Sequence, residues 1–393
     1  MCSVGDDLFD DNGLMSTIEV SRSKTCNKCK TAETHLVLRN KDAYCKSCFL
    51  ENVTHKFKST LGKSRLIRPG NRVLFLYEDN EASTALLHMV RDGLNLNTPK
   101  KLNFCPVIVF IEDLYHLTIE ERHNVIEQAN KVIGEFHFDL FLVSLAQYAG
   151  NTGSIDKLIC QASEVLPISE NDEHELFRNV QPNTSVTNKK ELISILKRNL
   201  LIEVAKHLDC KFIFTNEISQ DIAINLLTNV SLACGNRIPI EAGFCDDIDS
   251  QVKILRPLYL FDSKEIEFYT KYNNINYTHS RNEETNPYSS IQTLLEKFVV
   301  DLQANFPATI NTILKIGDKL DIVKGDISCQ LCKIPICEQS SQLTSEESTR
   351  FSSLVSTSKI DLADPDLSNK FAPINGKAYC FSCDELSKCL LKR

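Results

Sequence analysis

Short apolar runs alternate with amphipathic stretches through the middle of this 393-residue chain, and this alternation limits the possible folds more than any other feature. The apolar runs of strand length are Val73–Tyr77, Pro106–Ile111, Phe138–Val143, Lys211–Thr215 and Ile254–Tyr259. The stretches with helical spacing cover residues 81–92, 119–133, 188–208, 219–232 and 289–318. Near-continuous apolar strands separated by helices predict an α/β fold with a mainly parallel sheet and helices on both faces.

Paired cysteines stand near both ends of the chain. The first set is Cys26, Cys29, Cys45 and Cys48, with 15 residues between its pairs. The second set is Cys329, Cys332, Cys380 and Cys383, with 47 residues between its pairs; Cys337 and Cys389 are alternative ligands there. Two Cys-x-x-Cys turns direct four thiolates at one point, so we expect zinc at one or both ends, although another thiophilic metal stays open.

The sequence also predicts the compartment. No run of 18 or more apolar residues occurs, and the acidic N-terminus lacks the basic and then apolar pattern of a secretory signal. We therefore expect a cytoplasmic protein with no membrane partner. In that compartment, paired cysteines indicate metal binding rather than the disulfide framework of a secreted protein.

Charge is unevenly distributed along the chain. The net charge is −8, yet 13 Lys and Arg face three acids between Arg22 and Arg72. A basic segment on an acidic chain is typical of RNA contact and equally of a solvated basic surface. The candidate RNA-binding residues are Lys28, Lys30, Arg39, Lys46, Arg256 and Lys264. Such cations bind phosphates and give no base specificity.

Composition divides the chain into five predicted segments. They are a disordered acidic tail (1–21), a zinc ribbon-like module (22–60), the α/β core (68–275), a helical segment (276–325) and a C-terminal zinc-binding module (326–393) that contains a disordered insertion (338–370).

The loop after the first expected strand is the usual phosphate site of such a sheet. Here the loop from Glu78 to Ser83 contains no glycine and three carboxylates. A phosphate cradle needs glycines so that backbone N–H groups can close on the anion, and carboxylates repel a triphosphate. We therefore interpret Glu78, Asp79 and Glu81 as helix-capping acids and expect the loop to have lost its nucleotide chemistry.

Residues 73–90 resemble the start of the PP-loop ATP pyrophosphatases, whose loop reads Ser-Gly-Gly-x-Asp-Ser. Asp79 and Asn80 replace the two glycines, and only Ser83 matches. The segment from Arg256 to Tyr269 is similar to the Arg-Pro-Leu and Lys-Glu-Ile segment of the tRNA-thiolating branch. With cysteine pairs at both ends, the chain resembles the cytoplasmic tRNA 2-thiolation protein 2 family.

This resemblance implies a heterodimer with a catalytic PP-loop thiolase and contact with tRNA. Sulfur from a thiocarboxylated ubiquitin-related modifier would reach the wobble uridine of lysine, glutamate and glutamine tRNAs. We expect a non-catalytic or co-catalytic subunit, without catalytic residues or ATP of its own. Two alternatives stay open: an autonomous ATP-dependent tRNA sulfurtransferase that uses Cys234 and Cys245, and a zinc-dependent protein-interaction adapter.

Overall fold

The computed structural model describes residues 25–38, 42–98, 101–150, 155–161, 164, 166–178, 180–277, 286–322, 325, 327–336, 349, 352–353 and 379–390. The chain forms two compact units, Met1–His55 and Lys56–Arg393. The tail predicted at 1–21 and almost all of the insertion predicted at 338–370 lie outside the described residues. No helix within the described part of the chain is long and apolar enough to cross a membrane.

The N-terminal unit consists of a cysteine turn, a hairpin and the start of a helix. Strands β1 (Leu36–Leu38) and β2 (Asp42–Tyr44) pair in antiparallel fashion, and α1 (Lys46–Ser64) begins between Cys45 and Cys48. Lys30 has a φ of 57°, and its N–H donates to the carbonyl of Cys26 over 2.9 Å. This left-handed residue turns the chain back after the first pair of cysteines.

The main unit contains a seven-stranded sheet. In spatial order the strands are β6 (Ile159–Gln161), β5 (Leu140–Ser144), β4 (Cys105–Glu112), β3 (Arg72–Tyr77), β7 (Phe212–Phe214), β9 (Lys253–Leu255) and β8 (Cys245–Asp246). The five inner strands are parallel and the two edge strands antiparallel, which confirms the predicted fold class. The last predicted strand is too long: β9 ends at Leu255, and turns follow, in which Tyr259 N–H donates to the carbonyl of Arg256 over 3.2 Å.

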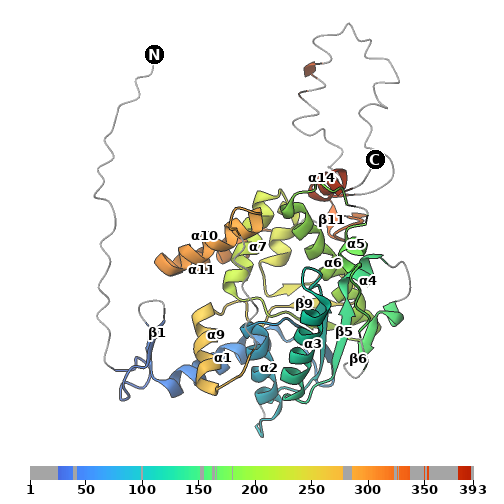
Figure 1. The fold of residues 1–393 in the computed structure, drawn as a ribbon. Helices are drawn as coiled ribbons and strands as arrows, with labels where there is room; N and C mark the ends of the chain where they lie inside the picture. The colour runs from blue at the N-terminus through green and yellow to red at the C-terminus, as the bar shows by residue number, and fades with distance from the viewer. Residues whose placement is uncertain are drawn as a thin grey trace, which may run out of the picture. The chain divides into compact units, whose positions relative to one another are not determined.

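Helices cover both faces of this sheet (Figure 1). They are α2 (Glu81–Leu94), α3 (Ile119–Gly134), α4 (Leu145–Gly150), α5 (Asp172–Leu176), α6 (Val186–His207), α7 (Ser219–Ser231), α8 (Ile238–Glu241) and α9 (Ser263–Asn273). The chain runs from β3 to β5 in one direction and through β7 to β9 in the other. Right-handed crossovers therefore place α2 and α3 on one face and α6 and α7 on the opposite face.

The order of the strands reverses between β3 and β7, where ligands bind in sheets of this kind. On the α6 face, Leu74 of β3 and Val109 of β4 share a buried cluster with Leu200 and Val204. Strand alternation points Phe75 to the other face, where its ring lies 4.8 Å from that of Phe214. The two layers of core fix the carboxyl ends of β3 and β7 side by side.

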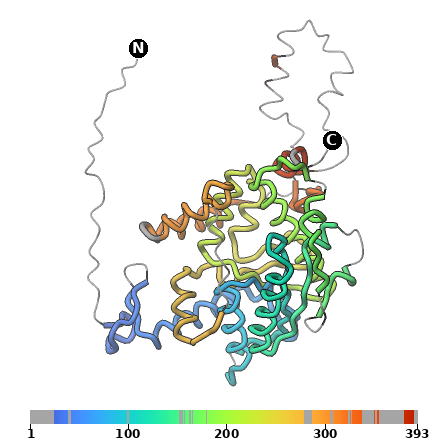
Figure 2. The backbone as a smooth tube through the Cα atoms, viewed as in Figure 1, coloured from blue at the N-terminus to red at the C-terminus, as the bar shows by residue number. Residues whose placement is uncertain are grey.

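A helical hairpin follows the sheet in the chain. Helices α10 (Ile291–Asn305) and α11 (Pro307–Gly317), orange in Figures 1 and 2, pack against each other and against α7. The predicted helical stretch at 289–318 is thus confirmed. It is divided at Phe306 because Pro307 can begin a helix but cannot continue one.

The C-terminal module belongs to the main unit. It contains β10 (Ile327–Ser328), β11 (Pro335–Ile336) and α14 (Phe381–Leu390). Lys333, directly after Cys332, has a φ of 62° and donates its N–H to the carbonyl of Cys329, as Lys30 does in the N-terminal unit. The module packs on α6, where Asn199 Nδ2 donates to the carbonyl of Leu331 over 2.9 Å.

Candidate functional site

In the loop between β3 and α2, side chains of the loop accept hydrogen bonds from the loop's own backbone amides. Asn80 caps α2, because its Oδ1 accepts from Ser83 N–H over 2.9 Å, and Ser83 Oγ accepts from Glu78 N–H over 3.1 Å. From the end of β7, Asn216 Nδ2 donates to Asn80 Oδ1 over 2.9 Å and to Glu78 Oε2 over 3.2 Å. Two backbone amides that could bind an anion therefore already have acceptors within the loop.

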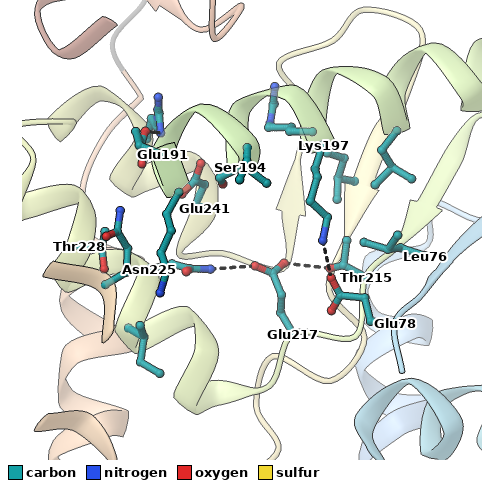
Figure 3. Close-up of a pocket in the computed structure, with 18 of the residues that line it drawn as sticks. Leu76, Glu78, Glu191, Ser194, Lys197, Thr215, Glu217, Asn225, Thr228 and Glu241 are labelled. Atoms are coloured by element: carbon teal, nitrogen blue, oxygen red, sulfur yellow. Dashed lines mark hydrogen bonds and ion pairs between the residues drawn. The ribbon is translucent and has the colours of Figure 1, made fainter. Parts of the chain in front are cut away.

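A lysine from α6 lies beside this loop. Lys197 Nζ is 3.2 Å from Glu78 Oε1 (Figure 3). It also lies 3.0 Å from Asp113 Oδ2. Burial alone would lower the pKa of the Lys197 ammonium, but Asp113 and then Glu78 outweigh it, so the pKa is raised. We call Glu78, Asp113 and Lys197 the ionic lock. Its two carboxylates exceed its one cation, which leaves no positive charge free for a phosphate.

Asp79 adds a second obstacle to an anion. Burial raises the pKa of its carboxyl to about 6, so the group is ionised at neutral pH. Its Oδ1 is buried and has no hydrogen-bond partner among the described residues. A residue aligned with a glycine of the PP-loop motif thus adds a negative charge to the loop, which is unfavourable both for phosphate and for the fold.

Two cavities, of about 400 Å³ and 670 Å³, meet at the loop and share Leu76 and the ionic lock as lining. The first extends between α6 and α7 (Figure 3). There Glu217 accepts from Asn225 Nδ2 over 3.1 Å and from Thr215 Oγ1 over 2.9 Å. Several charged side chains lie in the walls of this cavity, but Lys197, Arg237 and Arg256 are each paired with a carboxylate of the same lining.

Arg256 is part of these walls rather than of the surface. Its side chain is 4% exposed, and Nε lies 2.8 Å from Glu217 Oε2. A second guanidinium nitrogen donates to the carbonyls of Ile240 and Gly243 over 3.2 and 3.0 Å. Arg256 therefore ties the segment after β7 to α8. Contact with an RNA would require it to break all three interactions.

The other predicted RNA-binding cations differ in their settings. Lys264 is exposed on the first turn of α9, and Lys28, Lys30 and Lys46 are exposed in the N-terminal unit. Lys28 Nζ lies 2.9 Å from Glu51 Oε2, where both side chains are largely open to solvent, so this pair holds the lysine weakly. Arg39 lies outside the described residues.

The paired cysteines converge at both ends of the chain as their spacing predicts. In each set of four, all sulfur atoms lie within 4.8 Å of one another. Cys332 Sγ and Cys380 Sγ are 3.8 Å apart, and four thiolates about 2.3 Å from a zinc ion would form a tetrahedron with edges of about 3.8 Å. The donor type, number and spacing therefore fit a closed tetrahedral metal site. Cys337 and the side chain of Cys389 lie outside the described residues.

The C-terminal cysteines are also part of the core of the main unit. All four are buried, in one cluster with Leu192 and Ile195 of α6 and Ile240 of α8. Arg237 lies 3.9 Å from Cys383 Sγ and forms an ion pair with Glu191. A guanidinium beside thiolates favours their charged, metal-binding form. Nothing in the sequence near Arg237 indicated this contact, since Cys383 is 146 residues away.

Cys234 and Cys245, the candidate nucleophiles of an autonomous sulfurtransferase, lack the lowered pKa of a reactive cysteine. Cys234 is 3% exposed, and burial raises the pKa of its thiol to about 11. Burial also raises the pKa of Cys245. A reactive cysteine needs a lowered pKa and access to solvent. Within the described ranges, the two cysteine sets are the only groups of three or more potential metal ligands.

Comparison with known proteins gives consistent results. The sequence model of the family Cytoplasmic tRNA 2-thiolation protein 2 matches residues 290–385. Cytoplasmic tRNA 2-thiolation protein 2-A of Xenopus laevis is 30% identical over 411 residues, which cover 89% of this chain and 80% of the relative. Cytoplasmic tRNA 2-thiolation protein 2 of Aedes aegypti is 31% identical over 354 residues, which cover 86% of this chain and 75% of the relative.

Among solved structures, the fold is similar to that of the U34-tRNA thiolase NcsA from Methanococcus maripaludis, determined with its [4Fe-4S] cluster. The TM-score is 0.57 at 16% sequence identity, and the match covers 86% of this chain and 98% of the thiolase. At that identity the likeness concerns the fold alone.

Proposed function

Because this chain belongs to the cytoplasmic tRNA 2-thiolation protein 2 family, we propose that it is a subunit of the cytosolic complex that thiolates the wobble uridine of lysine, glutamate and glutamine tRNAs. Its partner in this proposal is a catalytic PP-loop thiolase, with which it forms a heterodimer. Sulfur arrives from a thiocarboxylated ubiquitin-related modifier. The chain itself helps to bind tRNA and does not perform the ATP-dependent step.

The observation that carries this proposal is the ionic lock. Lys197, which lies beside the loop, is paired with Glu78 and Asp113 at 3.2 and 3.0 Å, and the backbone amides of Glu78 and Ser83 donate to side chains of the loop itself. A nucleotide phosphate would have to displace these contacts and meet three carboxylates. A subunit with this loop needs a partner whose loop is open.

Both cysteine sets hold zinc in this proposal. Four thiolates close the coordination shell, so the ions are structural rather than catalytic. The N-terminal ion fixes the turn that carries Lys28 and Lys30, and the C-terminal ion fixes α14 on α6. The exposed Lys28, Lys30, Lys46 and Lys264 contribute phosphate contacts with tRNA, whereas Arg256 is excluded because it is buried and bonded within the protein.

The test is wobble-uridine thiolation in cells that lack this chain, read as the retardation of lysine tRNA in a mercury-containing gel. We expect the shift to disappear and to return with the intact chain. It should also return with Ser83→Ala, because Ser83 serves only the internal closure of the loop. Failure of a stable Ser83→Ala variant would show that the loop is a working active site. An unchanged shift in the deleted cells would exclude the thiolation role.

Purified protein provides an independent test. We expect no ATP binding by the isolated chain at micromolar concentrations in calorimetry. Tight ATP binding that Ser83→Ala abolishes would contradict the proposal that the partner subunit performs the ATP-dependent step. Lys197→Met should likewise bind no ATP, because removing the cation leaves the two carboxylates in place; ATP binding by this variant would contradict the interpretation of the ionic lock.

A further inference from the structure

The last turns of α1 carry a group of cations on the surface of the main unit. Phe57 and Leu61 are 0% and 7% exposed, so this face of the helix packs on the protein. The outward side carries a shallow depression, which is lined by Ser59, Gly62, Lys63 and Arg65. Lys58 precedes Gly62 by four residues and therefore lies beside it on the same face of the helix. We call the three cations of this surface, Lys58, Lys63 and Arg65, the basic corner.

The charges of the basic corner are not neutralised within the part of the chain that the structure describes. None of residues 52–77 is acidic, and no described carboxylate pairs with any of the three cations. The neighbouring Lys56 differs, because its Nζ lies 2.7 Å from Glu265 Oε2 and 4.4 Å from the centre of the Phe261 ring. This pair fixes α1 to α9. The C-terminal end of α1 adds only about half a negative charge, so positive charge stays available for an external anion.

The composition of this surface selects the kind of anion. A protein partner buries an apolar core at its interface, but no large apolar side chain of residues 52–77 is exposed. A sugar–phosphate backbone needs only cations and hydrogen-bond donors, which the basic corner and the Ser59 hydroxyl supply. At Gly62 a Cβ would meet nothing within 4 Å, so a phosphate has room to reach the surface of the helix between the cations.

We propose that the basic corner binds the sugar–phosphate backbone of tRNA. This inference rests on the proposed function and adds a phosphate-binding surface on the main unit, separate from the lysines of the N-terminal unit. Arg65 leads into the amino end of β3 through a turn in which Gly70 N–H donates to the carbonyl of Asn103 over 3.2 Å. The ionic lock lies at the carboxyl end of the same strand, whose six residues span roughly 20 Å. The basic corner therefore holds tRNA phosphates and takes no part in chemistry at the carboxyl edge.

Gly62 allows a test of charge that does not disturb the fold. It is helical and a Cβ there meets no other atom, so Gly62→Glu and its isosteric control Gly62→Gln both fit and both favour the helix. The measurement is the Kd of the purified full chain for an unmodified transcript of lysine tRNA. Gly62→Glu should raise the Kd about tenfold, because it places a carboxylate against the bound phosphate, and Gly62→Gln should leave the Kd unchanged. Replacing all three cations of the basic corner by glutamine should reduce the slope of log affinity against log salt by about 2–3.

Weaker binding by Gly62→Glu alone, with unchanged melting temperatures and the reduced salt slope of the triple variant, supports the basic corner. Equal binding by wild type and all variants overturns the basic corner and leaves the tRNA contact of the proposed function intact. Equal weakening by Gly62→Glu and Gly62→Gln shows an effect of bulk rather than charge and overturns the phosphate assignment. No tRNA binding by the wild-type chain overturns the tRNA contact itself. Tighter binding of polyglutamate than of tRNA assigns the surface to an acidic protein and overturns the proposal.

Discussion

Asp79→Asn should stabilise this protein at neutral pH and by about half as much in mild acid. The Asp79 carboxyl is partly buried, its Oδ1 has no hydrogen-bond partner among the described residues, and its pKa is raised from 3.8 to about 6 by burial. A carboxyl that binds its proton more tightly in the folded state destabilises that state as the pH rises above 3.8. The cost grows through the interval up to about pH 6 and is fully present above it.

The size of the effect follows from this difference in pKa. At full strength it corresponds to about 3 kcal/mol, and partial exposure of the carboxyl reduces it to about 1–2 kcal/mol. Asparagine has nearly the same shape and no charge, so it removes the cost. For a unit of this size we expect the melting temperature to rise by about 2–4 °C at about pH 7.5. At about pH 5 the gain should fall to about half.

The assay is thermal unfolding of the full chain, followed by circular dichroism at both pH values. Asp113→Asn serves as the control, because it breaks the 3.0 Å ion pair with Lys197. At about pH 7.5 it should lower the free energy of unfolding by up to about 1 kcal/mol, and the melting temperature should fall accordingly. A decrease with Asp79→Asn, or an equal increase at both pH values, would refute the reasoning.

Three further predictions follow from other parts of the structure. Elemental analysis should find two metal ions per full chain, and Cys26→Ser and Cys383→Ser should each remove one of them. Only Cys383→Ser should also lower the melting temperature of the main unit, because that cysteine set lies in the core of this unit. Arg122→Met should cost about 3–5 kcal/mol in urea unfolding, because it leaves the buried Glu112 and Asp172, each 2.7 Å from the guanidinium, without a cation; adding Glu112→Gln should recover part of that loss. Replacing Lys28, Lys30 and Lys46 together by glutamine should weaken tRNA binding in gel-shift titrations and reduce the slope of log affinity against log salt by about 2–3, while an unchanged slope would place the RNA elsewhere.

A structural feature can be predicted from the sequence when the residues that produce it lie close together in the chain. The strands and most helices follow from apolar runs within a few residues, and the cysteine sets converge because each Cys-x-x-Cys turn positions its own pair. The ionic lock joins Glu78 to Lys197, 119 residues away, and no sequence pattern links them. Arg256 looked like a surface cation before a proline; its partner Glu217 lies 39 residues earlier and could be paired with it only once β7 and β9 were adjacent.

The long separation between the two pairs of the C-terminal cysteine set affects the entropy of the unfolded chain. The two pairs are separated by 47 residues, so an ion bound by all four cysteines would close a loop of about 50 residues and would restrict the unfolded chain as a covalent cross-link does. On the chain-entropy scale used for disulfides, a loop of that length corresponds to about 4 kcal/mol. Thiolate–metal bonds would provide this restraint where glutathione would reduce a disulfide. With such an ion, the anchoring of α14 on α6 would depend on the free concentration of the metal in its surroundings.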